Sequence, residues 1–238
     1  FDRPRTFVVD VGGTRIGFAG FPYQREDVRS KFTDLVSATR WKAEPADIHF
    51  LCVHHCFEGA QVGAHNYTFR TGRDVVRVND VPHDFAAVLT GHVHRAQVLQ
   101  LDLRGQPLET PILYPGAIER TSFAERDESK GYFILNLRQR QSPKALTVDW
   151  EFRRLHARPM VVVELSVDGL GLDELQLLLR DLIRGMPDEA VAQIRVLGTP
   201  RAEARPILTA RYVRELAPST MNVEVVRADE RNRSSRRL

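Results

Sequence analysis

Two short apolar runs constrain the fold of this chain more than any other feature. Ile48–Val53 and Phe85–Leu89 are almost continuously apolar, which is the pattern of strands buried on both faces of a sheet. Histidines follow each run at once, as His54-His55 after the first and within Thr90-Gly91-His92-Val93-His94 after the second. We therefore expect core strands whose ends present clusters of imidazole nitrogens at a sheet edge.

Further strands and one helix are predicted around this core. Residues 6–20 read as a β-hairpin, because Gly12-Gly13 supplies a turn with positive φ. Apolar residues at helical spacing predict a helix over 26–38. Strands are also predicted over 74–78, 96–103, 112–114, 131–137 and 145–152. The long polar loop over 63–79 lies next to the histidines in sequence and is expected to be functional.

A second, smaller domain begins where the sequence character changes near Arg153–Pro159. Strands over 160–167, 190–197 and 221–226 alternate with helices over 172–186 and 202–216. The second of these helices tolerates Pro206 only in its first turn. We expect domains over 1–155 and 156–227, the latter a β-α-β-α-β unit, and a disordered basic tail over 228–238 that is either solvated or in contact with phosphates.

Composition limits the classes of protein that the chain can belong to. Its 238 residues suffice for one large domain or two smaller ones, and a net charge of +3 is too mild to establish a polyanionic partner. No run of 18 or more apolar residues occurs, so no membrane partner is expected. The two cysteines, Cys52 and Cys56, lie too far apart in an extended segment to form a disulfide, which fits a reducing, cytoplasmic compartment.

The strand-end histidines His54, His92 and His94 are suited to binding metal. Imidazole nitrogens and carboxylate oxygens hold the divalent ions that hydrolyse phosphate esters, around a position left open for water. One alternative is that these are ordinary surface histidines in loops. Another is a zinc site made by Cys52, His55 and Cys56, for which no fourth ligand is evident.

Five segments resemble a known family. Leu89–His94 looks like the last metal-binding motif of the calcineurin-like metallophosphoesterases, a Gly-His-x-His. Leu51–His55 looks like the motif before it, a single histidine that ends an apolar strand. Tyr114–Arg120, Phe123–Glu125 and Glu128–Tyr132 are similar to the stretch that follows in one branch, the SbcD-type DNA repair nucleases. The resemblance covers about residues 6–165.

The resemblance implies a fold of the α/β (α+β) class. Residues 1–155 would form the C-terminal majority of a metallophosphoesterase sandwich, in which two mixed sheets are flanked by helices. Residues 156–227 would form a small α/β domain that caps the DNA. The first of these domains would carry the nuclease activity.

The resemblance also implies roles for individual residues. Two divalent metal ions, manganese in this family, would be held with His54 and His92 on one ion and His94 on the other. His55 would face the substrate or merely fill the loop. Arg120 would contact DNA or brace the neighbouring Glu119.

The implied function is metal-dependent hydrolysis of phosphodiester bonds in DNA, by an exonuclease or endonuclease subunit in double-strand-break repair. The implied partners are DNA, an SMC-like ATPase subunit of the SbcC type and a second copy of the chain. One alternative is a small-molecule phosphodiesterase or phosphatase of the same superfamily, which would not explain the similarity over 114–132. The other is a non-catalytic binding module that has lost half of the metal site.

The earlier motifs of the family are not found upstream of His54. These motifs are an Asp-x-His, a Gly-Asp and a Gly-Asn-His followed by an acidic residue. Asp10 is no substitute, because it lies in a hairpin and lacks the x-His partner. The chain opens on Phe1 without an initiator methionine, so we expect either that these motifs lie in residues that precede it or that the chain is an isolated C-terminal portion.

Overall fold

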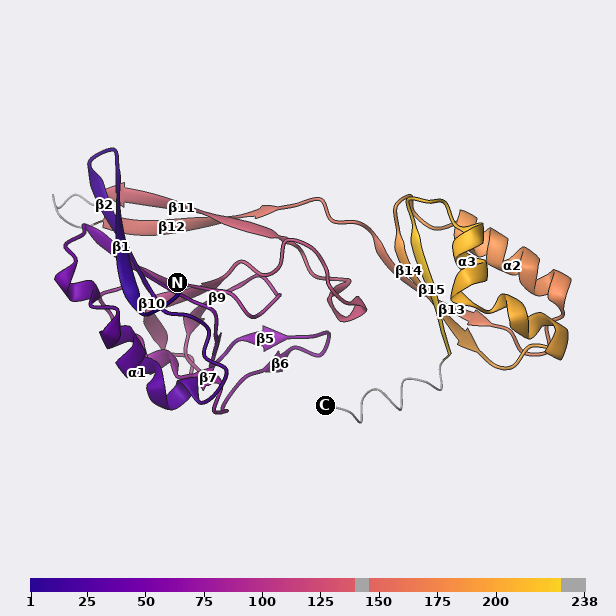
Figure 1. Cartoon of the computed structure of the whole chain (residues 1–238), viewed down its shortest axis with the longest axis horizontal. Helices are drawn as coiled ribbons and strands as arrows, with labels where there is room; N and C mark the ends of the chain where they lie inside the picture. Colours follow the sequence, from indigo (N-terminus) through magenta and orange to yellow (C-terminus); the bar gives the residue numbers. More distant parts are fainter. Residues whose placement is uncertain (140–145, 228–238) are drawn as a thin grey trace. The chain divides into compact units, whose positions relative to one another are not determined.

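The computed structural model describes residues 1–139 and 146–227, and the chain separates into two units, Phe1–His156 and Ala157–Leu238 (Figure 1). The division falls one residue after the predicted boundary. Each unit has an apolar core of its own, so each is described by itself. The fold is mixed α/β, with several sheets and few helices.

A six-stranded mixed sheet organises the N-terminal unit. In spatial order its strands are β1 (Arg5–Val11), β2 (Thr14–Gly20), β3 (Ile48–Val53), β8 (Ala87–Thr90), β10 (Pro107–Tyr114) and β9 (Gln97–Leu101). The four inner strands run parallel, while β1 and β9 are antiparallel edge strands. The two apolar runs are therefore neighbouring parallel strands, β3 and β8, at the centre of the sheet.

The predicted N-terminal hairpin is confirmed. Val11 pairs with Thr14 across a two-residue turn, and Gly12 and Gly13 have φ of 60° and 85°. Positive φ at both positions is the turn geometry whose twist matches that of two paired strands. The carboxylate of Asp10 accepts a hydrogen bond from the Gly13 N–H at 2.9 Å and closes the turn.

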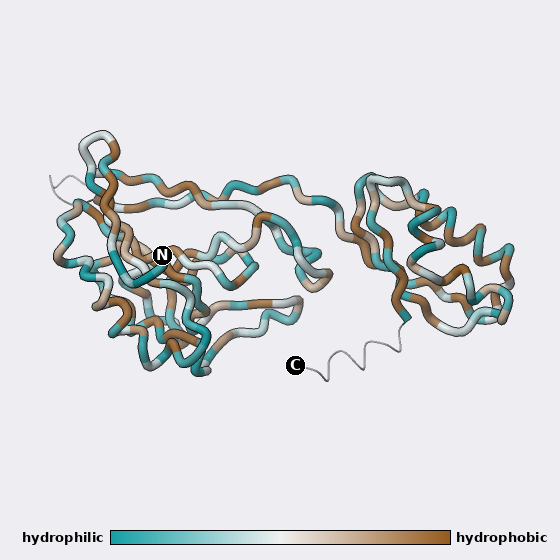
Figure 2. Tube along the Cα trace, in the orientation of Figure 1, coloured by the Kyte–Doolittle hydropathy of each residue, from teal (hydrophilic) through white to brown (hydrophobic). Residues whose placement is uncertain are grey.

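Both faces of the six-stranded sheet are covered. The predicted helix is confirmed as α1 (Val28–Ala38), whose buried Val28, Phe32 and Val36 join Leu51 of β3 in one core cluster. On the opposite face, Phe50 of β3 lies in a second cluster against the hairpin of β11 (Gly131–Gln139) and β12 (Leu146–Arg154). Apolar and polar residues alternate along β12, as a strand with one covered face requires (Figure 2).

The segment between β3 and β8 has more structure than the loop predicted from its polarity. It contains four two-residue strands, β4 (Cys56–Phe57), β5 (Gln61–Val62), β6 (Tyr67–Thr68) and β7 (Val75–Val76), followed by the 3₁₀ turn η2 (Val78–Asp80). β4 pairs with β7 and β5 pairs with β6. Two more 3₁₀ turns, η1 (Trp41–Ala43) and η3 (Phe123–Glu125), lie elsewhere in this unit.

The C-terminal unit confirms the predicted β-α-β-α-β order. Its parallel sheet has the strand order β13 (Met160–Ser166), β14 (Val191–Leu197) and β15 (Asn222–Arg227). The helix α2 (Leu172–Arg184) buries Leu175, Leu179 and Ile183 in the core of this unit.

The prediction of a single helix over 202–216 is wrong. The segment forms a 3₁₀ turn, η4 (Ala202–Ile207), and then a separate helix, α3 (Ala210–Leu216). Pro206 lies inside η4, where its missing N–H and its ring prevent a continuous α-helix. A new helix starts only after Thr209, whose hydroxyl accepts a hydrogen bond from the Tyr212 N–H at 3.3 Å.

Two predictions extend beyond the described residues. The disordered tail over 228–238 lies outside them, as does Ala145 at the start of the strand predicted over 145–152. Within residues 1–139 and 146–227, no helix combines the length and apolar character needed to cross a membrane.

Candidate functional site

The strand-end histidines come together because β3 and β8 are adjacent and parallel. Val53 and Thr90, the last residues of these strands, are paired in register, and the Gly91 N–H donates to the Val53 carbonyl at 3.3 Å. The carboxyl ends of parallel strands lie at the same edge of a sheet. His54 and His92 therefore leave the sheet side by side, and both are exposed.

The rings of His54 and His92 are 5.5 Å apart between centroids and meet edge to face, at 82°. Gly91 makes this approach possible, since a Cβ atom at that position would lie 2.4 Å from Nδ1 of His54. His92 itself has a φ of 76°, a conformation that costs free energy for a residue with a side chain and that often occurs at functional sites. The glycine in the Gly-His-x-His motif is thus required by the packing of its neighbour.

Tyr23 is a member of this cluster that sequence reasoning missed. Its ring stacks on His55 at 5.1 Å and on His92 at 5.6 Å, and it meets His54 edge to face at 5.8 Å. Tyr23 follows β2, the parallel neighbour of β3, so a third strand end contributes to the same edge. The position of Tyr23 depends on the strand order of the sheet, for which its local sequence carries no signal.

His55 fills the core beneath this cluster. Only 1% of the residue is exposed, and its Nε2 accepts a hydrogen bond from the Gln24 N–H at 3.3 Å. Its backbone N–H and C=O both bond to the hydroxyl of Thr90, at 3.2 and 3.0 Å. Burial, followed by the neighbouring His92 and His54, lowers the pKa of His55 to about 4, so the ring is neutral at neutral pH.

His94 is held apart from the stacked rings by an acidic partner. Its Nδ1 lies 3.1 Å from Oε1 of Glu125 and 3.3 Å from the hydroxyl of Thr121, which itself donates to the same carboxylate oxygen at 2.7 Å. An ionised carboxylate can only accept, so Nδ1 of His94 carries the proton in this pair. In the neutral ring Nε2 then bears the lone pair, which is the arrangement found in metal-ligating histidines with a carboxylate partner.

Lys130 supports Glu125 from beneath and is itself buried, with none of its side chain exposed. Its ammonium group donates to Glu125 Oε2 at 2.6 Å, to Glu128 Oε2 at 3.3 Å and to the His94 carbonyl at 2.9 Å. Arg95 adds a second cation, whose Nε lies 3.1 Å from Glu128. Sequence reasoning assigned no role to these acids or to Lys130, although all three lie in the segments that resemble the nuclease branch.

This network controls the charge of Glu125. Burial raises the pKa of the carboxyl group, but hydrogen bonds from Lys130, Thr121 and His94 outweigh that effect and bring the pKa down to about 2. Glu125 is therefore a permanent anion at neutral pH and a fixed acceptor for His94.

The backbone after β10 packs against the same histidine. The Ala117 N–H donates to the His94 carbonyl at 3.0 Å. Gly116 has a φ of 77°, and a Cβ atom there would lie 2.6 Å from that carbonyl oxygen. The Pro115-Gly116 turn therefore fits closely around His94, and only glycine permits this approach.

Arg120 is placed within this loop. Its backbone N–H donates to the Glu119 carboxylate at 2.8 Å, and its Nε donates to the Glu128 carbonyl at 3.2 Å. These contacts match the bracing role that was one of its two predicted roles. The contact with DNA stays a prediction.

The two cysteines of the alternative zinc site lie in apolar surroundings. Cys56 is buried and Cys52 is partly buried, and burial raises their pKa values to about 12 and about 11. Both side chains therefore carry protons at neutral pH and pack as small hydrophobic groups.

A cavity of about 270 Å³ opens beside the histidines, lined among others by His92, His94, Arg95, Glu125 and Glu128. Within the part of the chain that the structure describes, no group of three or more His, Cys, Asp or Glu side chains is close enough together to hold a metal ion. The described residues do supply a pair of exposed imidazoles and a third imidazole with a fixed tautomer.

No family model matches this chain, and no curated protein matches it either.

Proposed function

We propose that the protein is a metal-dependent phosphodiesterase that acts on DNA, the C-terminal majority of an SbcD-type nuclease subunit. One observation carries this proposal: the segment that resembles the nuclease branch, Tyr114–Tyr132, contacts two of the histidines that follow the core strands, His94 and His55. Ala117 and Lys130 both donate to the His94 carbonyl, and the buried Tyr114 hydroxyl donates to the His55 carbonyl at 3.2 Å. Two resemblances that are separate in sequence thus concern a single connected site.

The architecture is interpreted in the same way. The six-stranded sheet and the hairpin of β11 and β12 would be parts of the two layers of a metallophosphoesterase sandwich. The C-terminal unit would cap the DNA. DNA, an SMC-like ATPase of the SbcC type and a second copy of the chain would be the partners, in the cytoplasm.

The imidazoles fit the metal ions that this family binds. His54 and His92 would hold one divalent ion and His94 the other, with manganese as the proposed metal. In this family the bridging aspartate and the asparagine ligand belong to the earlier motifs, which are not found upstream of His54. When bound, such ions generate a hydroxide from water at neutral pH and stabilise the charge that develops on the phosphoryl oxygens.

The side chains of this chain prepare that site in three ways. Burial, followed by the neighbouring His54 and His94, lowers the pKa of His92, so its lone pair is available at neutral pH. Glu125 keeps the proton of His94 on Nδ1 and leaves Nε2 as the donor atom. The ring of Tyr23 lies against His54 and His92 and limits the direction from which a substrate can approach.

Hydrolysis of linear duplex DNA by the full-length gene product with manganese tests the proposal. His54→Ala and His92→Ala should each lower the rate by about 100-fold or more, because each removes a metal ligand. His83→Ala is the matched control. His83 is exposed, its Nδ1 lies 3.2 Å from the Glu109 carboxylate, and it is not a member of the histidine cluster. No DNA hydrolysis by the full-length protein, or an unchanged rate in His92→Ala, would overturn the proposal.

Two further measurements separate the alternatives. Faster turnover of a small bis-aryl phosphodiester than of duplex ends would favour a small-molecule phosphodiesterase. The metal content of the purified full-length protein addresses the remaining alternative, because a non-catalytic module that has lost half of the site would bind no manganese.

A further inference from the structure

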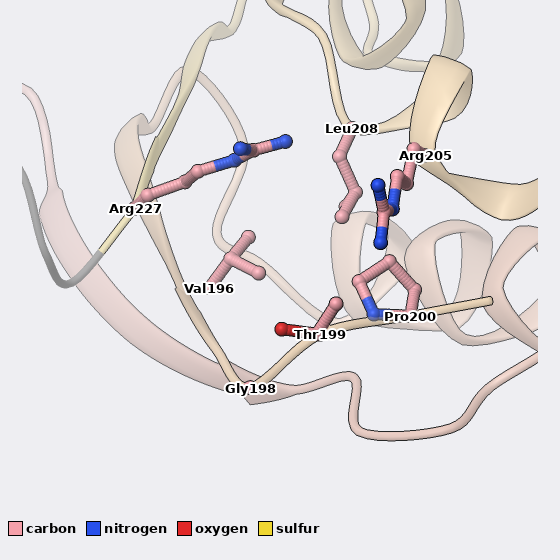
Figure 3. A pocket seen from close by; sticks show the side chains of 7 residues that line it. All are labelled: Val196, Gly198, Thr199, Pro200, Arg205, Leu208 and Arg227. Atoms are coloured by element: carbon pink, nitrogen blue, oxygen red, sulfur yellow. The ribbon is translucent and has the colours of Figure 1, made fainter. Parts of the chain in front are cut away.

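A pocket of about 450 Å³ opens in the C-terminal unit (Figure 3). It lies beyond the end of β14, where Gly198, Thr199 and Pro200 form part of its wall, and it also borders Arg227, the last residue of β15. In open α/β sheets, ligands bind outside the carboxyl ends of the parallel strands. The pocket therefore has the position at which this architecture normally binds small molecules.

Two arginines give the pocket its charge. Figure 3 shows Arg205, from η4, and Arg227, from the end of β15, reaching into the space from opposite sides. Among residues 1–139 and 146–227, neither guanidinium group forms an ion pair or a hydrogen bond. Arg211 and Arg195 of the same unit differ, since they bond to Glu215 at 2.9 Å and to Gln193 at 3.0 Å. Two like charges that face one cavity favour a bound anion between them.

Thr199 adds a hydroxyl group carried on an anchored stretch of backbone. Its backbone N–H donates to the Asp168 carboxylate at 2.9 Å, and its carbonyl accepts from the Gly169 N–H at 3.0 Å. The residue is thus anchored on both sides, while its side-chain oxygen borders the pocket (Figure 3). Asp168 is the acidic group next to this wall, and its single charge is outweighed by the two guanidinium groups.

The remaining walls are apolar. Val196 and Leu208 are 4% and 9% exposed, and Pro200 lies beneath Arg205 (Figure 3). A volume of about 450 Å³ falls in the usual range of small-molecule sites, roughly 300–1,000 Å³, and exceeds what an isolated anion needs. The ligand should therefore carry an organic group as well as its charge.

We propose that this pocket binds a small phosphomonoester, in which a dianionic phosphate is attached to a compact, partly apolar group such as a nucleoside. Arg205 and Arg227 would bind the phosphate oxygens, since the guanidinium fork matches their geometry. The Thr199 hydroxyl would donate a further hydrogen bond, and Val196, Pro200 and Leu208 would contact the organic group. This site is independent of the proposed nuclease activity, so either proposal can fail alone.

Calorimetric titration of the purified protein with adenosine 5′-monophosphate, in the presence of a chelator that removes metal ions, tests this proposal. Adenosine and inorganic phosphate are titrated in parallel. We expect the monophosphate to bind, adenosine to show no binding, and inorganic phosphate to bind at least about tenfold more weakly than the monophosphate. No binding of the monophosphate would overturn the proposal, and equal affinity for inorganic phosphate would overturn the assigned ligand class.

Variants locate the site. Arg205→Gln and Arg227→Gln should each weaken binding by about tenfold or more, because each removes charged hydrogen bonds to the phosphate. Arg211→Gln is the matched control and should leave the affinity within about twofold, since that side chain is 90% exposed on α3 and lines no part of the pocket. Unchanged affinity in both pocket variants, or an equal loss in Arg211→Gln, would contradict the assignment. All three arginines are exposed, so the variants should fold normally.

Discussion

Replacing Lys130 with methionine should destabilise the N-terminal unit strongly. The ammonium group is fully buried and uses all of its protons, on Glu125 at 2.6 Å, Glu128 at 3.3 Å and the His94 carbonyl at 2.9 Å. Methionine has a similar length and fills much of the same space, so the substitution mainly removes charge and hydrogen bonds.

The magnitude follows from the burial of the partners. The side chains of Glu125 and Glu128 are only 13% and 10% exposed, so both carboxylates would stay largely out of water without their cation. Breaking a buried ion pair from one side costs about 3–5 kcal/mol. Arg95 still pairs with Glu128 at 3.1 Å, so most of the cost should arise at Glu125.

The pH dependence gives a second, independent readout. The pKa of Glu125 is about 2 in the folded protein, below its ordinary value of 4.5. A lowered carboxyl pKa contributes stability that is fully present above pH 4.5 and is lost as the pH falls toward 2. Without Lys130 this pKa should rise, so the free energy of unfolding should depend less on pH across that window.

Urea unfolding followed by tryptophan fluorescence measures both effects. Trp41 and Trp150 are the only tryptophans and both lie in the N-terminal unit, so the signal reports on that unit. Lys31→Met is the matched control, because Lys31 is exposed on α1 and its loss should change stability by less than about 0.5 kcal/mol. A decrease of less than about 1 kcal/mol in the free energy of unfolding of Lys130→Met would refute this account of the network. An unchanged pH dependence of that free energy below pH 4.5 would refute it as well.

Three further outcomes are expected. Gly91→Ala brings a Cβ atom to 2.4 Å from Nδ1 of His54, so the affinity for manganese measured by calorimetry should fall by about 10–100-fold. The circular dichroism spectrum should stay unchanged, and an equal affinity would contradict the packing argument. Tyr114→Phe removes a buried hydroxyl that bridges two backbone groups and should cost about 1–3 kcal/mol in the urea assay, whereas a neutral effect would show that water replaces it. Cys52 and Cys56, with pKa values raised to about 11 and about 12, should resist iodoacetamide at about pH 8 in the native protein and react in denaturant, and rapid native alkylation in mass spectra would refute their burial.

Local patterns in the sequence identified the strands that position the site. Ile48–Val53 and the run before His92 are apolar for the length of a strand. Such runs predict central strands reliably, because the centre of a parallel sheet is covered on both faces. Once the two strands are known to be neighbours, the meeting of His54 and His92 follows from their parallel direction alone.

Contacts between distant segments could not be predicted in the same way. Tyr23 joins the histidines only because β2 pairs with β3, and Glu125 reaches His94 across 31 positions of sequence. The apolar pattern over 202–216 predicts one helix, but the same pattern also fits a 3₁₀ turn followed by a short helix. The sequence pattern therefore does not reveal that Pro206 interrupts the helix. Such features depend on tertiary packing rather than on local periodicity.

Lys130 joins two places that are far apart in the sequence. Its side chain bonds to the His94 carbonyl at 2.9 Å, while its own carbonyl accepts the Leu155 N–H at 2.8 Å, directly after β12. We expect a ligand that holds His94 in place to oppose local opening at the end of this hairpin as well, and by reciprocity the hairpin end should favour the bound state of His94. Hydrogen exchange at the Leu155 amide should therefore slow when a ligand occupies His94.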